Sequence, residues 1–430
     1  MNVLVIGSGG REHALCRTLR LNASGGALPR VFCAPGNAGI ASDAECVPVG
    51  ATDVTALADF AESLHVDLTI PGGEAPLAAG LADEFRRRGL SVAGPTREAA
   101  QLESSKAFAK DFMLRHEVPT ARHRVASTVE EARGVLRGGE FGGEDSPVVV
   151  KADGLAAGKG VVVARSRAEA EESVVALMEG GRVGSNAAER VVIEEALAGR
   201  EASLLLWTDG RDYRLMPPAR DHKRVGEGDT GPNTGGMGAI TSHDVLDEET
   251  LARAVREIVE PTLAGVEADG LDFRGIIFIG LMLTDEGPRV LEYNVRFGDP
   301  ETQAILVRLR TDPFEIFDAV ARGRVGELKV EWSEEASACV VLAARGYPEK
   351  PETGARISGL EEGARVPGVQ IFHAGTARAP DGSLVTAGGR VLGVTATGTT
   401  LDYALAHCYE SASRIAWDGC HYRRDIGKFK

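Results

Sequence analysis

Val150-Lys151-Ala152-Asp153-Gly154-Leu155-Ala156-Ala157-Gly158-Lys159-Gly160-Val161 sets a glycine-rich turn between two short apolar runs. A Walker-type phosphate loop would need Gly at position 153, Ser or Thr at position 160, and a helix afterwards. Asp153 and Gly160 stand there instead, and Val161-Val162-Val163 is typical of a strand. We therefore predict a β-hairpin flap whose backbone amides approach phosphate, with Lys151 and Lys159 adding positive charge. The alternative is a solvent-exposed hairpin with two surface lysines.

The residues around this hairpin form a small α/β pattern. Helical spacing is found near Ser127–Leu136 and again over Arg167–Met178, and the runs Val148–Val150 and Val161–Ala164 are typical of strands. We expect one small unit over about 121–192.

A second polar stretch reads Val290-Leu291-Glu292-Tyr293-Asn294-Val295-Arg296-Phe297-Gly298-Asp299-Pro300-Glu301. On a strand, Glu292, Asn294 and Arg296 share one face because side chains alternate. A carboxylate and an amide oxygen suit Mg²⁺, which keeps water and phosphate oxygens as its other ligands, and Arg296 can then bridge phosphate. An ordinary half-exposed strand also carries polar residues at alternate positions. The apolar flanks and the Gly-Asp-Pro turn favour the metal site.

The first hundred residues alternate strand and helix patterns, which predicts a parallel α/β sheet with ligands at the carboxyl ends of its strands. The four expected strands are Val3–Ile6, Val31–Ala34, Asp67–Ile70 and Leu90–Ala93.

The turn after the first strand, Gly7-Ser8-Gly9-Gly10-Arg11-Glu12-His13, invites a dinucleotide interpretation. Glu12 stands where that fingerprint needs its third Gly, and Cys33-Ala34-Pro35 replaces the acidic end of the second strand, so NAD and FAD are disfavoured. Two interpretations remain: an anion site at a helix N-terminus, strengthened by Arg11, or a plain tight turn.

Two later segments have both a functional and an ordinary interpretation. Glu194 to Leu197 fit a hinge whose backbone holds adenine, and Glu201 fits the ribose hydroxyls. The sequence alone favours the alternative, an exposed turn. His222-Lys223-Arg224 open a glycine-rich loop, 221–239, and are able to neutralise phosphate or carboxylate. A solvated charge run is the usual outcome for such a trio. After Trp332 a last unit follows, with strands Ser337–Ala344 and Leu392–Ala396 and a helix near Leu401–Ile415.

Composition excludes several classes of protein. A length of 430 residues predicts roughly three domains, and a net charge of −15 argues against a nucleic-acid binder. No run reaches the ~18 apolar residues of a membrane span, and the N-terminus lacks the basic region of a signal peptide. The six cysteines form no C-x-x-C pair, which suits a reducing cytoplasm.

Taken in order, these stretches resemble the ATP-grasp ligases, and specifically the glycinamide ribonucleotide synthetase (phosphoribosylamine–glycine ligase) family. The strings that carry the resemblance span the chain: Gly9 to Ala14, Ala34 to Gly39, Lys151 to Gly160, Asp221 to Arg224, Gly231 to Gly238, Arg296 to Glu301, Phe372 to Thr376 and Gly388 to Val391.

The resemblance implies an α/β fold in three parts. We expect an N-terminal parallel α/β domain over 1–103 on the phosphoribosylamine side. An ATP-grasp core over 104–120 and 193–330 carries a small flap subdomain over 121–192. A small mixed α+β C-terminal domain covers 331–430. The resemblance also suggests a monomer in the cytosol that needs no nucleic acid and no membrane.

The implied reaction consumes ATP. ATP phosphorylates the carboxylate of glycine to glycyl phosphate, and the amine of 5-phosphoribosylamine attacks it, giving glycinamide ribonucleotide, ADP and phosphate. Positioning and charge neutralisation matter more here than a dedicated base.

The resemblance also implies a role for each matching position. The ATP contacts are Lys106, Lys151, Gly154, Gly158, Lys159, Gly160, Glu194, Glu195, Ala196, Leu197 and Glu201. Mg²⁺ or Mn²⁺ is assigned to Glu292 and Asn294. The phosphoryl group and glycine are assigned to Arg296, Asp221, Lys223, Asn233 and Gly235. The phosphoribosylamine side is lined by Gly10, Arg11, Glu12, His13, Asn37, Gly73, Glu74 and Asp299.

The chain departs from the family pattern at three places. Pro71-Gly72-Gly73-Glu74 stands where the family more often has Gly-Pro-Glu, and Arg345 stands where a small residue is usual. The run Gly275 to Leu283 offers no further carboxylate, so only two protein ligands are expected for the metal. The alternatives are another ATP-grasp ligase or carboxylase, a non-catalytic nucleotide sensor, and an NAD-dependent dehydrogenase.

Overall fold

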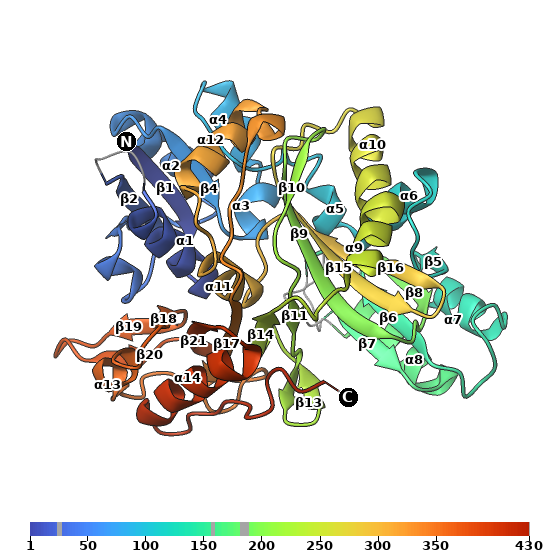
Figure 1. Cartoon of the computed structure of the whole chain (residues 1–430). Coiled ribbons are helices and arrows are strands. Elements are labelled where there is room, and N and C mark those ends of the chain that lie inside the picture. Colours follow the sequence, from blue (N-terminus) through green and yellow to red (C-terminus); the bar gives the residue numbers. More distant parts are fainter. Residues whose placement is uncertain (24–27, 156–159, 181–188, 430) are drawn as a thin grey trace.

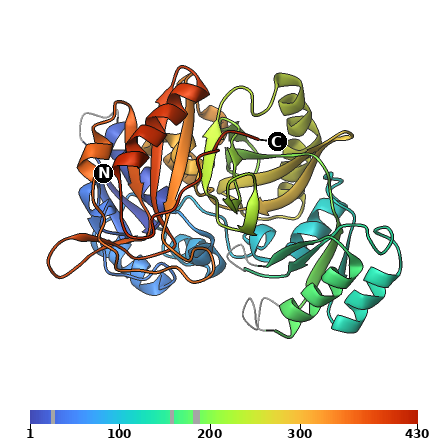
Figure 2. The same cartoon turned by 90° about the horizontal axis from the view of Figure 1, so that it is seen from below.

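The computed structural model (Figure 1) describes residues 1–23, 28–155, 160–180 and 189–429. The N-terminal domain and the C-terminal sheet lie on one side, and the core sheet with its flap lies on the other (Figures 1 and 2). Gly158 and Lys159, which the resemblance assigns to ATP, lie outside these described residues.

The N-terminal sheet has the strand order β3-β2-β1-β4, and every pair is parallel. Its elements are β1 (Asn2–Gly7), α1 (Gly10–Leu21), β2 (Arg30–Pro35), a 3-10 turn (Ile40–Ser42), β3 (Glu45–Cys46), α2 (Val54–Ser63), β4 (Leu68–Pro71), α3 (Glu74–Ala78) and α4 (Leu81–Arg87). The apolar strand residues Val3 to Ile6 are completely buried, which explains why this run reads as a strand.

The fourth strand expected for this sheet, Leu90–Ala93, is wrong. Leu90–Ala93 forms only a single parallel bridge, Thr69 with Val92, held by the hydrogen bonds Thr69 N to Ser91 O (3.0 Å) and Ala93 N to Thr69 O (2.9 Å). Gly94-Pro95 follows at once, and a proline has no N–H to extend the ladder. The short strand β3 takes the fourth place instead.

The flap subdomain is a four-stranded antiparallel sheet of order β5-β8-β6-β7. Its elements are β5 (His123–Ala126), α7 (Val129–Arg137), β6 (Val148–Ala152), β7 (Val161–Ala164), α8 (Arg167–Met178) and β8 (Val191–Glu195). Strands β6 and β7 pair antiparallel from Val148 with Ala164 to Lys151 with Val161, so the predicted hairpin is confirmed. Buried side chains of α7 and α8 pack with those of the sheet in one core.

The core sheet is antiparallel, with the order β10-β9-β15-β16. Its strands are β9 (Arg200–Thr208), β10 (Tyr213–Leu215), β15 (Gly275–Thr284) and β16 (Gly287–Asn294). The helices associated with it are α5 (Gln101–Ser104), α6 (Lys106–Arg115), α9 (Glu248–Ala254), a π-helical turn (Val255–Val259) and α10 (Glu260–Ala268). The chain then continues through α11 (Glu301–Leu306), α12 (Pro313–Arg322) and a 3-10 turn (Val325–Glu327).

The C-terminal sheet has the order β11-β14-β17-β21-β18. Its elements are β11 (Arg220–Asp221), β14 (Gly238–Thr241), β17 (Ala336–Ala343), α13 (Leu360–Ala364), β18 (Val369–His373), β21 (Arg390–Gly398) and α14 (Leu401–Arg414). Two hairpins accompany it, β12 (Arg224–Gly226) with β13 (Thr230–Asn233) and β19 (Thr376–Arg378) with β20 (Leu384–Thr386).

The expected loop over 221–239 is therefore wrong as a loop. Its two ends are strands of the C-terminal sheet and its middle is the β12–β13 hairpin. Met237, Ala239 and Ile240 are buried there, so the segment supplies core as well as polar side chains.

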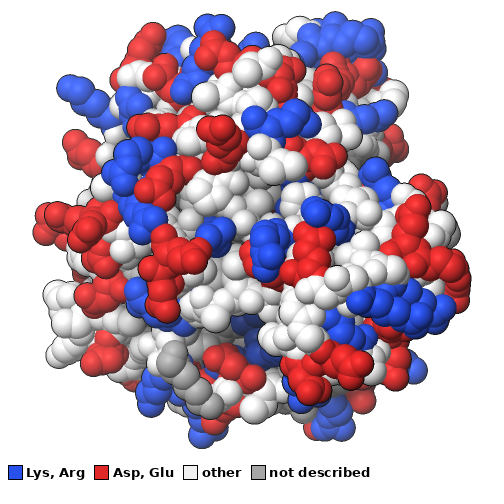
Figure 3. All heavy atoms as spheres, turned by 90° about the vertical axis from the view of Figure 1, so that its right-hand side faces the viewer, with Lys and Arg blue, Asp and Glu red and all other residues white. Residues whose placement is uncertain are grey.

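Figure 3 shows the face on the right-hand side of Figure 1. Acidic and basic side chains are mixed across it and do not form separate acidic and basic patches. Among the described residues, no helix combines the length and the apolar character needed to cross a membrane.

Candidate active site

The flap is fastened to the core sheet by lysines of the predicted ATP site. Lys151 on β6 donates from Nζ to the carbonyl of Leu291 on β16 at 3.0 Å. Lys106, the first residue of α6, donates from Nζ to the carbonyl of Gly154 at 3.1 Å. Both ammonium groups thus lie where the flap, α6 and β16 meet. Burial lowers the pKa of Lys106.

Glu292 is the carboxylate at this junction. Burial alone would raise its pKa, but the ammonium groups of Lys223, Lys151 and Lys106 and the guanidinium of Arg296 hold that pKa below its ordinary value. The carboxylate is therefore ionised at neutral pH. The same four cations are able to meet an anion such as a phosphate chain bound beside Glu292.

Glu292 and Asn294 offer the hard oxygen donors that Mg²⁺ takes. They lie opposite Gly280 and Phe278 on β15, alternate positions of that strand, so they share the face expected from the sequence. Across the described ranges, no group of three or more His, Cys, Asp or Glu side chains is arranged to hold a metal. The fit therefore rests on these two ligands, with other positions left to phosphate and water.

Arg296 lies beyond the end of β16 rather than on the strand, which corrects the strand assumption made from the sequence. Its guanidinium still reaches the same face, donating to Oδ1 of Asn294 at 2.9 Å. Glu74 (3.1 Å) and Glu103 (2.8 Å) form ion pairs with it from two other segments. Glu103 was not predicted: it is buried, and its other oxygen accepts from the backbone N–H of Val295 at 2.8 Å.

Glu194 has a side-chain role that the sequence did not suggest. Its carboxylate is buried between the ammonium groups of Lys151 (2.9 Å) and Lys110 (3.1 Å). The hinge hypothesis used only the backbone of Glu194, whereas the side chain here fixes the position of Lys151. Lys110 was not predicted at all, and burial lowers its pKa to about 8.

The rest of the predicted adenine hinge lies between β8 and β9. Ala196 and Leu197 are half-buried in this connection, and Glu195 pairs with Arg122 at 2.7 Å. Glu201, expected at the ribose, instead pairs with Lys223 at 2.8 Å.

The trio His222-Lys223-Arg224 does not act as one cationic group. Lys223 faces the site, where burial opposes its charge but Glu201, Asp221 and Glu292 raise its pKa. Arg224 donates to the carbonyl of Gly231 within its own hairpin (2.8 Å). His222 is buried, and burial lowers its pKa to about 4, so its ring is neutral. Both interpretations of this trio, an anion cradle and a solvated run, are therefore wrong as stated.

Asp221 lies beside Lys223 and close to a second carboxylate, Glu301, which was not predicted. Burial and this mutual repulsion raise the pKa of Glu301. Burial likewise raises the pKa of Asp221, against the opposing effect of Lys223. Glu301 is the first residue of α11 and is buried.

Gly235, two residues after the end of β13 at Asn233, is held by residues that come later in the chain. The N–H of Gly235 donates to the hydroxyl of Tyr347 at 3.0 Å, and its carbonyl accepts from Arg390 at 2.5 Å. Arg390 also donates to the carbonyl of Asp299 at 2.5 Å and pairs with its carboxylate at 3.2 Å. Arg390 belongs to a string that carried the resemblance, yet no role was assigned to it.

Residues from the N-terminus of α1 approach the same region. Arg11 pairs with Glu12 (2.6 Å) and approaches Glu74 (3.8 Å), and it donates to the carbonyl of Phe297 at 3.2 Å. Glu12 is buried, and one of its oxygens accepts from the N–H of Gly9 at 2.5 Å. Glu12 thus caps the helix rather than facing outward, which explains why Gly is not needed at its position.

The glycines on this side leave little room. A Cβ on Gly10 would lie 2.5 Å from Nε2 of Gln303, and one on Gly73 would lie 2.6 Å from Nη2 of Arg11. Gln303 in turn donates to the carboxylate of Asp299 at 2.7 Å. The expected phosphoribosylamine residues Gly10, Arg11, Gly73 and Asp299 are therefore close neighbours.

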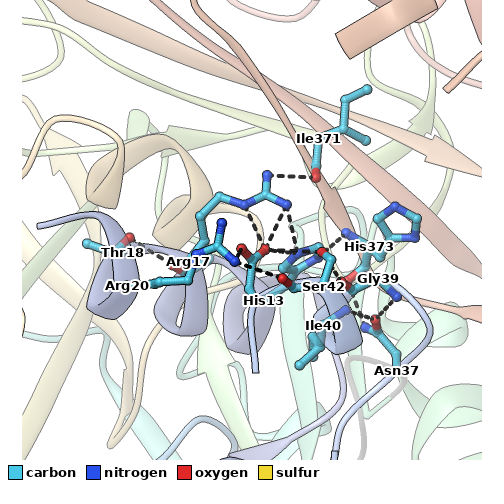
Figure 4. Close-up of polar contacts among 12 residues, drawn as sticks. His13, Arg17, Thr18, Arg20, Asn37, Gly39, Ile40, Ser42, Ile371 and His373 are labelled. Atoms are coloured by element: carbon cyan, nitrogen blue, oxygen red, sulfur yellow. Dashed lines mark hydrogen bonds and ion pairs between the residues drawn. The ribbon is translucent and has the colours of Figure 1, made fainter. Parts of the chain in front are cut away.

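His13 and Asn37 form a separate group that joins the N-terminal domain to β18 (Figure 4). Nδ1 of His13 accepts from the backbone N–H of His373 at 2.7 Å, so Nε2 carries the proton and donates to Asp43 at 3.0 Å. Arg17 contacts the same carboxylate at 2.9 Å. Burial lowers the pKa of His13.

The carboxamide of Asn37 is equally occupied. It donates to the carbonyls of Ser8 (2.8 Å) and His373 (2.9 Å) and accepts from the N–H groups of Gly39 and Ile40. The structure thus places both side chains in a joint between domains, apart from the charged cluster around Arg296.

Comparison with known proteins is consistent with this geometry over the whole chain. Three family models match in order: the phosphoribosylglycinamide synthetase N domain over 1–103, its ATP-grasp (A) domain over 104–302, and its C domain over 337–429.

Individual relatives agree with the family models. The chain is 48% identical to a phosphoribosylamine–glycine ligase of Brucella melitensis, covering 99% of this chain and 97% of that protein. It is 48% identical to the ligase of the same name from Escherichia coli strain K12, covering 99% and 98%. The crystal structure of a phosphoribosylamine–glycine ligase from Thermotoga maritima superposes with a TM-score of 0.83 at 38% identity, covering 99% of this chain and 100% of the other. This chain belongs to the phosphoribosylglycinamide synthetase family.

Proposed function

We propose that this protein joins glycine to 5-phosphoribosylamine with hydrolysis of ATP to ADP and phosphate, a ligation in purine biosynthesis. The family membership supports the substrates. The single observation that carries the chemistry is the position of the Glu292 carboxylate, within electrostatic reach of Lys106, Lys151, Lys223 and Arg296 between flap and core.

The residues divide the work by position. Lys106 and Lys151 hold the phosphates of ATP under the flap, together with the backbone of Gly154 and Gly160. Gly158 and Lys159, outside the described residues, stay assigned to ATP by the resemblance. Glu194 keeps Lys151 in place through their 2.9 Å contact. Glu195, Ala196 and Leu197 line the adenine side, and Glu201 takes the ribose when Lys223 releases it.

Glu292 and Asn294 would hold Mg²⁺ or Mn²⁺, which would neutralise phosphate charge when bound. Arg296 stabilises the charge of the transferring phosphoryl group, and Asp221, Lys223, Asn233 and Gly235 surround glycine and its phosphorylated form. Glycyl phosphate is the proposed intermediate, because a free carboxylate does not react with an amine without activation.

The amine substrate enters from the side of α1. Arg11, at the N-terminus of the helix, supplies charge for the phosphate of 5-phosphoribosylamine. Gly10, Glu12, Gly73, Glu74 and Asp299 shape the walls around it. His13 and Asn37 act indirectly by holding the first turn against β18. We further propose the division into 1–103, 104–120 with 193–330, 121–192 and 331–430, and a monomer working in the cytoplasm.

The test is ADP release by the purified protein with Mg-ATP, glycine and freshly generated phosphoribosylamine, leaving out each component in turn. We expect ADP only when glycine and the amine are both present. ADP formation that ignores either of them would remove the substrate assignment and retain an ATP-dependent ligase of another specificity. Binding of ATP without any turnover would favour a nucleotide sensor.

A further inference from the structure

The segment His421–Phe429, here called the C-terminal segment, lies across the β12–β13 hairpin and β11 (Figure 1). Nε2 of His421 donates to the carbonyl of Val225 at 3.0 Å, and the N–H of Arg424 donates to Glu227 at 3.1 Å. Sequence motifs drew no attention to this segment, which lies about two hundred residues away from the hairpin in the chain.

A buried guanidinium anchors the middle of the C-terminal segment. The side chain of Arg423 is 0% exposed, pairs with Asp229 and Asp425 at 2.8 Å each, and donates to the carbonyl of Arg224 at 3.0 Å. A charge removed from water in this way needs all its partners, so the hairpin and the segment are held in one relative position.

The end of the segment clamps the residues on either side of Asp221. The ring of Phe429 stacks on His222 with centroids 4.2 Å apart and planes 11° apart. The guanidinium carbon of Arg220 lies 3.4 Å from the centroid of the same ring. The N–H of Gly427 donates to Nε2 of His222 at 2.9 Å. Positions 220 and 222 are thus both held from the side of the C-terminal segment.

Alternation along an extended chain turns the neighbours to the other side. Lys223 pairs with Glu201 there and lies within electrostatic reach of Glu292, and Asp221 lies beside Lys223 and Glu301. Arg220 and His222 therefore face the C-terminal segment. Asp221 and Lys223, two of the residues assigned to the acyl phosphate, face the opposite side.

We propose that Phe429 is a positioning residue for the ligation: by clamping His222 and Arg220 it sets the direction of Asp221 and Lys223 toward the phosphoryl group. This inference rests on the proposed function of the site. The reaction depends on geometry rather than on a strong base, and a misplacement of about 1 Å in such a site costs about two orders of magnitude in rate.

The experiment compares Phe429→Ala with Lys428→Ala, an exposed position one residue earlier in the same segment. We expect Phe429→Ala to lower kcat by about ten-fold or more while the KM for ATP changes by less than about two-fold. Phe429→Tyr keeps the ring and should restore kcat to within about two-fold of the wild type. Amide hydrogen exchange over 220–233 should accelerate in Phe429→Ala and not in Lys428→Ala.

Each outcome supports or overturns the role proposed for Phe429. Equal kcat for Phe429→Ala and Lys428→Ala, with active wild-type protein, would overturn the clamp and leave the proposed function intact. A loss of kcat that Phe429→Tyr does not restore would also overturn it, because the ring would not be the cause. If Phe429→Ala fails to fold, Phe429→Leu is judged by the same comparison. Wild-type protein without ligase activity would remove the proposed function itself, and the clamp with it.

Discussion

Arg296 donates a hydrogen bond from Nη2 to Oδ1 of Asn294 at 2.9 Å, so the residue assigned to phosphate directly contacts a residue assigned to metal. The same guanidinium forms ion pairs with Glu74 and Glu103. Binding of a metal ion to the oxygen of Asn294 therefore has to share or displace this contact. If the proposed assignments hold, phosphate and metal act on the same pair of side chains, Arg296 and Asn294.

Glu292→Ala tests the metal assignment. The substitution removes the only carboxylate of the assigned metal pair, whereas Lys151, Lys223 and Arg296 keep their other carboxylate partners. We expect kcat to fall by at least about 10²–10³-fold. The change in activity is measured as ADP release across a Mg²⁺ titration, and folding is followed by circular dichroism. Near-wild-type turnover in a folded Glu292→Ala protein would sink the metal site.

Arg11→Ala tests the phosphoribosylamine side. We expect the KM for 5-phosphoribosylamine to rise about ten-fold, the effect of one lost charge-assisted hydrogen bond, with a smaller change in the KM for ATP. The matched control is Arg20→Ala, on the same helix but 45% exposed. Because Arg11 also partners buried Glu12, thermal unfolding is recorded for both variants. Equal changes in the two Michaelis constants would refute the role.

Local signals in the sequence were enough for much of the fold. The bounds of β7 and α8 agree with the apolar runs that predicted them, and Ser166 caps α8 by accepting from the N–H of Glu169. Such features depend on neighbours within a few residues, which the sequence displays directly. The strand alternation that placed Glu292 and Asn294 on one face is of the same kind.

Contacts between distant segments were not accessible in this way. Glu103 accepts from Val295, 192 positions along the chain, and His222 accepts from Gly427, 205 positions along it. No local pattern marks either partner. A trio of adjacent cations suggested one anion cradle, yet tertiary packing sends His222 and Lys223 to opposite sides, because one contacts the C-terminal segment and the other contacts Glu201.

Glu194→Ala and Glu195→Ala form a matched pair that tests the buried ion pair. Removing Glu194 leaves Lys110 and Lys151 buried without their shared carboxylate, so we expect a loss of about 3–5 kcal/mol in the free energy of unfolding. Glu195 accepts from the guanidinium of Arg122 at 2.7 Å and from its backbone N–H at 2.9 Å. Because the Arg122 side chain is 61% exposed, the loss of Glu195 should cost less, about 1–2 kcal/mol. Urea unfolding measures both.

ATP binding distinguishes the same two variants. Lys151 loses the group that holds it beside the flap in Glu194→Ala. The affinity for ATP should therefore weaken more there than in Glu195→Ala, because the carboxylate of Glu195 is bound to Arg122 and not to a lysine of the flap. Similar unfolding free energies for the two proteins would contradict a structural role of the buried carboxylate.

The acid stability of the protein should depend on His222. Its pKa in the folded protein is about 4, against an ordinary value of 6.5, because burial disfavours the charged ring. Between those two values the unfolded chain binds the proton more readily than the folded protein. The contribution of His222 to the free energy of unfolding therefore grows as the pH rises from 4 to 6.5, and it is lost as the pH falls through this window. At about 1.4 kcal/mol per pKa unit the contribution is about 3–4 kcal/mol.

His222→Gln removes the titrating group and keeps an oxygen able to accept from the N–H of Gly427. Urea unfolding at a series of pH values should therefore show a shallower dependence in the variant between pH 4 and 6.5. His13 and His373 also have lowered pKa values, but they are present in both proteins and cancel in the comparison. Parallel curves for wild type and variant would mean that the pKa of His222 is the same in the folded and the unfolded protein, which would contradict the lowered value caused by burial.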